Sequence, residues 1–123
     1  MEQPLKGKTG LRRILNATRY SFEGLGAAWR HEAAFRQVSV LALVGIALAW
    51  WLPLPLWGRG LLMLAHLLTL VIELFNSAIE AAVDHTSLER HPLAKRAKDL
   101  GSAAQFVGLV NLALLWALVW CSR

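Results

Sequence analysis

Three carboxylates and one amide stand at regular spacing in a mostly apolar stretch of the chain. Glu73, Asn76, Glu80 and Asp84 occupy positions i, i+3, i+7 and i+11. On a helix of 3.6 residues per turn, the three carboxylates lie within about 20° of one direction and the amide about 60° away. A carboxylate in hydrocarbon costs roughly 2.5–3.5 kcal/mol, so it is kept where it faces a bundle interior, a cavity or a cation. These four residues, named the acidic stripe below, therefore indicate a functional site.

Glu73 and Glu80 differ in depth, and this difference separates their chemistry. They lie two helical turns apart, roughly 10.5 Å along the axis, so they cannot both ligate one metal ion directly. If this helix spans a membrane, Glu73 lies deeper in the hydrocarbon than Glu80. Its surroundings are then less polar, which suits a carboxylate that acts as a proton acceptor. Glu80 and Glu32 lie on the same side of the membrane, and paired carboxylates with open sites suit Mg²⁺ bound to phosphates. Cationic donors for phosphate are Arg13, Lys95, Arg96 and Lys98.

The composition places these residues in a membrane protein. Of the 123 residues, 56% are apolar and 17% are charged, which lies outside the usual range of soluble proteins. Three apolar segments reach the roughly 20 residues that a spanning helix needs, the second by continuing through the acidic stripe. We expect one all-α domain over residues 1–123, with membrane spans at about 37–57, 60–83 and 100–121.

An amphipathic surface helix is predicted before the first span. From about residue 10 to residue 31, apolar side chains recur at threes and fours with basic residues between them, which is typical of a helix in the membrane interface. A short turn stiffened by Pro53 and Pro55 joins the first two spans. Residues 85–96 are expected to form a loop interrupted by Pro92.

The distribution of basic residues predicts the orientation in the membrane. Seven precede the first span, four lie between the second and third spans, and only Arg59 and Arg123 remain for the other side. By the positive-inside rule, the N-terminus and the second loop are cytoplasmic. The net charge of +5 is explained by attraction to the membrane surface, and we expect no nucleic-acid partner.

Several of these residues lie in recognisable motifs. The segments ELFNSAIEAAVD (73–84), HPLAKRAKD (91–99) and GSAA (101–104) resemble the signature of the prokaryotic diacylglycerol kinases. The segment AAWRHEAAFRQ (27–37) is similar to the proteobacterial branch of that family. The resemblance implies a small homotrimeric kinase of the bacterial inner (cytoplasmic) membrane, with active sites at subunit boundaries. Such an enzyme transfers the γ-phosphate of MgATP to diacylglycerol, giving phosphatidic acid and ADP.

The resemblance also implies roles for individual residues. Glu73 matches the general base, Glu32 and Glu80 match the metal-binding carboxylates, and the residues that order the reaction centre match Asn76, Lys98 and Asp99. The implied nucleotide-binding residues are Arg13, Tyr20, Glu32, Glu80, Glu89, His91, Lys98 and Asp99. The implied lipid-binding residues are Arg13, Ser21, Glu73 and Ser102. Asn16, Phe22 and Val38 differ from the residues at these positions in better-known members.

Other interpretations stay open. Undecaprenol kinase, the activity of the related Gram-positive branch, uses the same stripe, although the segment at 27–37 favours diacylglycerol. A small proton-coupled transporter also places a Glu in the membrane, but it has no need for Lys98, Asp99 or Glu32. The stripe could instead line a hydrogen-bonded helix interface, and His66 is expected to be an interior residue. Because three spans are expected to leave a one-sided stripe exposed to lipid, we predict a homo-oligomer.

Overall fold

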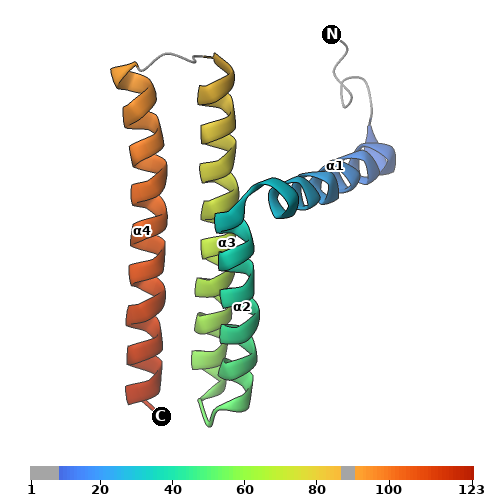
Figure 1. Ribbon diagram of the computed structural model, residues 1–123. Helices are drawn as coiled ribbons and strands as arrows, with labels where there is room; N and C mark the ends of the chain where they lie inside the picture. Colours follow the sequence, from blue (N-terminus) through green and yellow to red (C-terminus); the bar gives the residue numbers. More distant parts are fainter. Residues whose placement is uncertain (1–8, 87–90) are drawn as a thin grey trace.

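A computed structural model describes residues 9–86 and 91–123, and it contains four helices in these two ranges (Figure 1). Helices α2, α3 and α4 run side by side, while α1 projects away from them at a steep angle (Figure 1). Helix α3 packs against both α2 and α4, and α1 contacts α2. The predicted all-α architecture with a separate N-terminal amphipathic helix is confirmed.

Helix α1 (Gly10–His31) covers the range that the apolar periodicity predicts. It ends at Glu32, whose extended backbone separates it from α2 (Ala33–Trp51) by a single residue. The last carbonyl groups of a helix lack partners within it. Arg36 of α2 supplies hydrogen-bond partners at the end of α1, because its Nη1 donates to Trp29 O at 2.7 Å and to Arg30 O at 3.3 Å. The sharp change of direction between the two helices is thereby held by one side chain of α2.

The turn after α2 is held in a similar way. Arg59 of α3 (Leu56–Thr86) donates from Nε to Ala49 O at 3.1 Å and from Nη2 to Leu52 O at 2.9 Å. Its guanidinium also lies 5.4 Å from the ring centroid of Trp50, a cation–π contact. The Arg59 guanidinium therefore donates to the free carbonyl groups at the end of α2 and stabilises the α2–α3 turn. The sequence did not predict this role.

Helix α4 (Pro92–Cys121) begins earlier than predicted. The expected loop at 85–96 is wrong for His85 and Thr86, which end α3, and for Pro92–Arg96, which form the first turn of α4. Pro92 stands at the start of the helix, where its missing N–H costs nothing and its fixed φ is helical. His91 caps this end, since its Nδ1 accepts a hydrogen bond from Leu93 N at 3.1 Å. Pro92 therefore marks the start of α4 and does not lie within a loop.

Three of the helices in the described ranges, α2, α3 and α4, are long and apolar enough to span a membrane. Helix α2 has 19 residues, or about 28 Å, which matches a hydrocarbon core of about 30 Å. Helices α3 and α4 have 31 and 30 residues, or about 45 Å each. Both are level with α2 at the turn end (Figure 1), so their excess length extends beyond the core at the opposite end.

Glycines allow the three spanning helices to approach one another closely. A Cβ at Gly45 of α2 would overlap the His66 ring of α3, and one at Gly58 would lie 2.5 Å from Val119 Cγ1 of α4. Ala49, Leu54, Leu62 and Val119 form a buried apolar cluster near the turn. Many large apolar side chains on the outward faces are exposed, as expected for surfaces that meet lipid or other subunits.

Candidate active site

The acidic stripe of α3 faces α4. Along α4, Lys98, Gly101 and Gln105 recur at threes and fours and therefore share one face. This face meets the stripe at three levels. Lys98 forms an ion pair with the stripe, the backbone of Gly101 approaches it closely, and Gln105 donates a hydrogen bond to it. The stripe consequently faces the interior of the bundle, as the cost of a carboxylate in hydrocarbon requires.

Glu73 occupies the deepest level and is 5% exposed. Its Oε1 accepts a hydrogen bond of 3.0 Å from Nε2 of Gln105, which is also buried. Gln105 was not among the residues predicted from the sequence. A signal was present, because Gln105 lies four residues after Gly101 and three before Gly108 in a span without charged residues. The expectation that one chain leaves this stripe exposed to lipid is wrong for Glu73, because α4 covers it.

Asn76 and Glu80 form the middle level of the stripe. Asn76 Nδ2 donates to Glu80 Oε1 at 3.4 Å, a long hydrogen bond. Gly101 of α4 lies directly against the Asn76 side chain, and a Cβ there would overlap Asn76 Oδ1. That oxygen is buried and has no hydrogen-bond partner among the described residues. Asn76 is therefore enclosed by α4 with an acceptor still available.

Among the described residues, two ion pairs lie at the end of the bundle where α3 and α4 extend beyond α2. Lys98 Nζ lies 2.6 Å from Asp84 Oδ1, and Lys95 Nζ lies 2.6 Å from Asp99 Oδ2. Both lysines precede the charge-free part of α4 that begins at Leu100. The hydrogen bonds to Asp84 and Asp99 raise the pKa of Lys98 and of Lys95 respectively. Both ammonium groups therefore stay charged at neutral pH.

These positions give each group a depth in the membrane. Counted from Leu56, the about 20 residues that cross a hydrocarbon core end near Phe75. Glu73 then lies within the last turn inside the core, and Glu80 lies about 7 Å beyond it. Counted back from Cys121, the same length ends near Ser102, so Lys98 lies about 6 Å beyond the core. The site thus crosses from hydrocarbon to the head-group level.

A cavity of about 560 Å³ lies between α1 and α3 and is named the α1–α3 groove. Ser21 and Glu32 line it from the N-terminal side, and Leu74, Ser77 and Ala78 line it from α3. These α3 residues lie roughly 100° around the helix from the acidic stripe. A single chain therefore brings Ser21 and Glu32 together but places Glu73 on a different face of α3.

The other predicted site residues that the structure describes, Arg13, Tyr20, His91 and Ser102, make no hydrogen bond or ion pair with the stripe. Tyr20 of α1 is half buried and lies beside Arg19, whose guanidinium is 5.1 Å from the ring centroid. Arg13 and Ser102 are exposed, and His91 serves as the α4 cap. Glu89 lies outside the described residues. Their roles toward nucleotide and lipid stay predictions.

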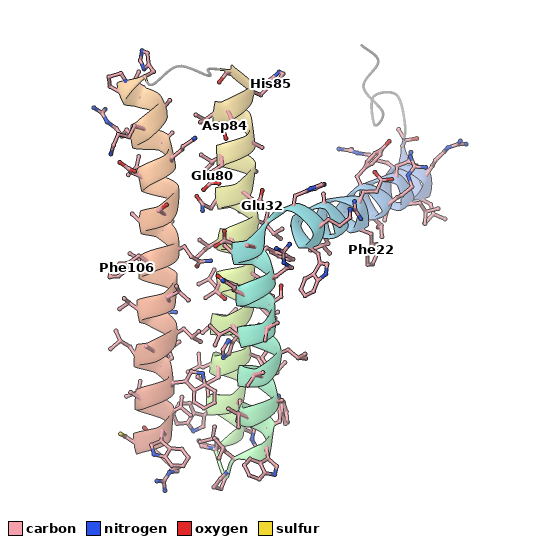
Figure 2. The ribbon with its side chains drawn as sticks, viewed as in Figure 1. Phe22, Glu32, Glu80, Asp84, His85 and Phe106 are labelled. Carbon is pink, nitrogen blue, oxygen red and sulfur yellow. The ribbon has the colours of Figure 1, made fainter. Side chains whose placement is uncertain are left out.

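The carboxylates proposed for metal binding fit Mg²⁺ by type. Glu32 makes no side-chain hydrogen bond to the start of α2, and Glu80 is half buried with only the long contact to Asn76 on its Oε1. Figure 2 shows Glu32 at the α1–α2 junction, at a height along the bundle similar to that of Glu80. Within 9–86 and 91–123, no three His, Cys, Asp or Glu side chains gather to enclose a metal. Mg²⁺ in phosphoryl-transfer sites needs only one or two carboxylates, because phosphates and waters complete its shell.

His66 is an interior residue, as expected, and is 1% exposed. Its Nε2 accepts a hydrogen bond of 3.1 Å from Trp116 Nε1, and the two rings meet edge to face. This contact joins α3 to α4 near the turn end of the bundle, about two turns from Glu73. It positions the helices and lies outside the candidate site.

The chain is similar to known proteins over most of its length. The family model described as prokaryotic diacylglycerol kinase matches residues 19–120. A diacylglycerol kinase of Pseudomonas aeruginosa is 56% identical over 116 residues, covering 94% of this chain and 94% of the relative. One of Helicobacter pylori is 50% identical over 119 residues (97% and 89%), and one of Escherichia coli K12 is 44% identical over 113 residues (91% and 93%). The chain therefore belongs to the prokaryotic diacylglycerol kinase family.

Proposed function

We propose that the protein phosphorylates diacylglycerol with ATP, giving phosphatidic acid and ADP. The observation that carries this proposal is the buried Glu73, held at the inner edge of the hydrocarbon core. A lipid alcohol is confined to the bilayer and ATP to water, so their reaction requires groups at this boundary. Glu73 on the lipid side, with Glu80 and Lys98 about two turns beyond it, provides this arrangement.

Glu73 acts as the general base. The hydroxyl oxygen of diacylglycerol bonds to the γ-phosphorus of ATP, its proton passes to the Glu73 carboxylate, and the bond to the leaving ADP breaks. In the described structure, one oxygen of Glu73 accepts from Gln105, which leaves its other oxygen for the substrate. Asn76, with its unpartnered Oδ1, helps to order the reaction centre.

The nucleotide lies at the head-group level. Lys98 and Arg13 neutralise the charge that spreads over the transferred phosphoryl group. Glu32 and Glu80 would hold Mg²⁺, which would supply positive charge to offset that of the ATP phosphates. Tyr20, Glu89, His91 and Asp99 complete the proposed nucleotide contacts.

The lipid reaches the site along the α1–α3 groove. The groove opens beside the amphipathic α1 and is lined by Ser21, so it can take the glycerol and the start of an acyl chain. Because Glu73 faces away from this groove within one chain, the site is shared between subunits. A homotrimer, as the family resemblance implies, places the groove of one chain against the stripe and Ser102 of the next.

The orientation follows from the same arrangement. The protein lies in the bacterial inner membrane with its N-terminus in the cytoplasm, because ATP must reach Lys98 and Glu80. The basic residues of α1 and of the first turn of α4 lie at this end, in agreement with the positive-inside rule. Trp57 and the C-terminus then face outward.

The proposed activity is tested with the purified protein in mixed micelles. ATP and Mg²⁺ are supplied with either diacylglycerol or undecaprenol, and the phosphorylated lipid is measured. We expect diacylglycerol to be phosphorylated with a kcat/KM at least about tenfold higher. A faster reaction with undecaprenol would reverse the substrate assignment. Phosphorylation of neither lipid, together with solute flux driven by a pH gradient in vesicles, would favour the transporter.

A further inference from the structure

Gln105 bridges two acceptors that lie one turn apart on α3. Its Nε2 donates to Thr69 O at 2.9 Å and to Glu73 Oε1 at 3.0 Å. The glutamine is 7% exposed, and Thr69 and Glu73 are buried as well. A primary amide has two N–H donors, and both are used here. The contact therefore connects the backbone of α3 to the carboxylate through a side chain of α4.

The orientation of this amide is fixed by its surroundings. If the amide were reversed, its carbonyl oxygen would face a backbone carbonyl and a carboxylate, both of which are acceptors. The Thr69 carbonyl belongs to a regular helix and cannot move, so it sets the plane in which the second N–H points at Glu73. Gly108 gives the side chain its room, because a Cβ there would lie 3.1 Å from Gln105 Oε1 and 2.8 Å from Ile72 Cδ1.

This arrangement has a consequence for Glu73, whose side chain has three rotatable bonds. An anchored donor on Oε1 restricts the carboxylate to the conformations that keep this hydrogen bond, and it leaves Oε2 as the second acceptor. Among residues 9–86 and 91–123, no hydrogen bond to Oε2 is found. A hydrogen bond on the protein surface would not fix the carboxylate in this way, because water competes for both groups. Here Gln105 is also bonded to the backbone of α3, and both side chains are shielded from water.

We propose that Gln105 is a positioning residue for the phosphoryl transfer, which holds the Glu73 carboxylate so that Oε2 meets the hydroxyl of the lipid. The proposal rests on the proposed function, because it takes Glu73 as the base. Gln105 acts through Glu73 and contacts neither ATP nor metal. A general base must be within hydrogen-bond reach of its proton, and misplacement by 1 Å can lower a rate by about 100-fold.

A double-mutant cycle separates positioning from a role in folding alone. Gln105→Met keeps the length of the side chain and removes both donors. We expect kcat to fall about 10- to 100-fold, with the KM for MgATP unchanged within about twofold. When Glu73 is already Gln, the same substitution should change kcat by less than about twofold, because residues that act as a unit are not additive.

The matched control is Trp116→Phe, which removes another, partly buried hydrogen bond between α3 and α4 without touching Glu73. It should lower thermal stability as much as Gln105→Met or more, yet leave kcat within about twofold of the wild type. If Gln105→Met does not assemble, Gln105→Asn is used, since its shorter amide keeps the polarity but cannot span both acceptors. The same loss of kcat is expected.

The outcomes distinguish this inference from the proposed function. Full kcat in Gln105→Met, or losses that multiply in the double variant, would overturn the positioning role while the kinase activity stands. Equal losses of kcat in Gln105→Met and Trp116→Phe would also overturn it, because both would then reflect packing. Near-normal kcat in Glu73→Gln would overturn both the base assignment and the role of Gln105.

Discussion

Lys98 Nζ of α4 and Asp84 Oδ1 of α3 lie 2.6 Å apart, and this ion pair joins the two helices where they extend beyond the hydrocarbon core. The side chains are 42% and 60% exposed, so water screens the pair and it contributes little to stability. A phosphate group can therefore draw Lys98 away from Asp84 at little cost. The neighbouring Asp99 pairs with Lys95 instead, at 2.6 Å.

Lys98→Met is expected to raise the KM for MgATP about tenfold, because it removes a phosphate-level cation worth about 1.4 kcal/mol of binding. The melting temperature should change little, since the pair with Asp84 is half exposed. Steady-state kinetics with varied MgATP give the KM. Arg12→Met is the control: it also removes an exposed cation from the same side of the membrane, but Arg12 is not among the predicted phosphate donors. Equal increases in KM for the two variants would contradict a specific role for Lys98.

Glu80→Gln is expected to raise the Mg²⁺ concentration that gives half-maximal rate by roughly tenfold, or about 1.4 kcal/mol. The substitution removes ligand charge but keeps the size of the side chain. The rate is measured against total Mg²⁺ at fixed ATP. Glu23→Gln, which changes an exposed glutamate of α1 that pairs with Arg19, serves as the control. An unchanged metal titration in Glu80→Gln would remove this residue from the metal site.

Gly45→Ala is expected to lower the free energy of unfolding by about 1–3 kcal/mol, because its Cβ overlaps the His66 ring. That ring cannot move freely, since Trp116 Nε1 donates to it at 3.1 Å. Gly60→Ala is the control: nothing lies within 4 Å of its Cβ, and it should be neutral or stabilising by about 0.4–1 kcal/mol. Unfolding in detergent is followed by circular dichroism. Equal stability of the two variants would show that α2 and α3 do not pack at Gly45.

A shared site predicts complementation between subunits. Glu32 lies in the α1–α3 groove and Glu73 on another face of α3, so in a homotrimer they act together across a boundary. Glu32→Gln and Glu73→Gln should each be nearly inactive alone, and mixed oligomers of the two should regain a substantial part of the activity. Native mass spectrometry in mild detergent should find trimers. Active monomers, or no recovery in mixed oligomers confirmed by mass, would contradict the shared site.

Periodicity predicted the elements and the direction of the stripe well. The amphipathic helix at 10–31 and the polar face of Glu73, Asn76 and Glu80 follow from spacing along one helix, which is a local property. The start of α4 was misplaced because Pro92 was read as a helix breaker, although proline is equally typical of the first helical turn.

The contacts between helices were not predictable in the same way. Spacing shows which face of a helix is polar, but it does not show the register between two helices. Gln105 was missed for this reason: its partner Glu73 is 32 positions away in sequence. The cover that α4 gives to Glu73 was missed for the same reason. The proposed oligomer therefore follows from the division of the site between the two faces of α3, and not from exposure of Glu73 to lipid.

In the proposed mechanism, Glu73 accepts the proton of the lipid hydroxyl and binds neither metal nor nucleotide. The most direct test of this role is the kinetics of Glu73→Gln, which keeps the volume of the side chain and can still hydrogen-bond with Gln105. Phosphorylation of diacylglycerol is measured against MgATP concentration in mixed micelles. We predict that kcat falls about 10²- to 10⁴-fold while the KM for MgATP stays within about twofold of the wild type. Near-normal kcat with a strongly raised KM for MgATP would show that Glu73 is not the base and would place it with the metal and nucleotide ligands.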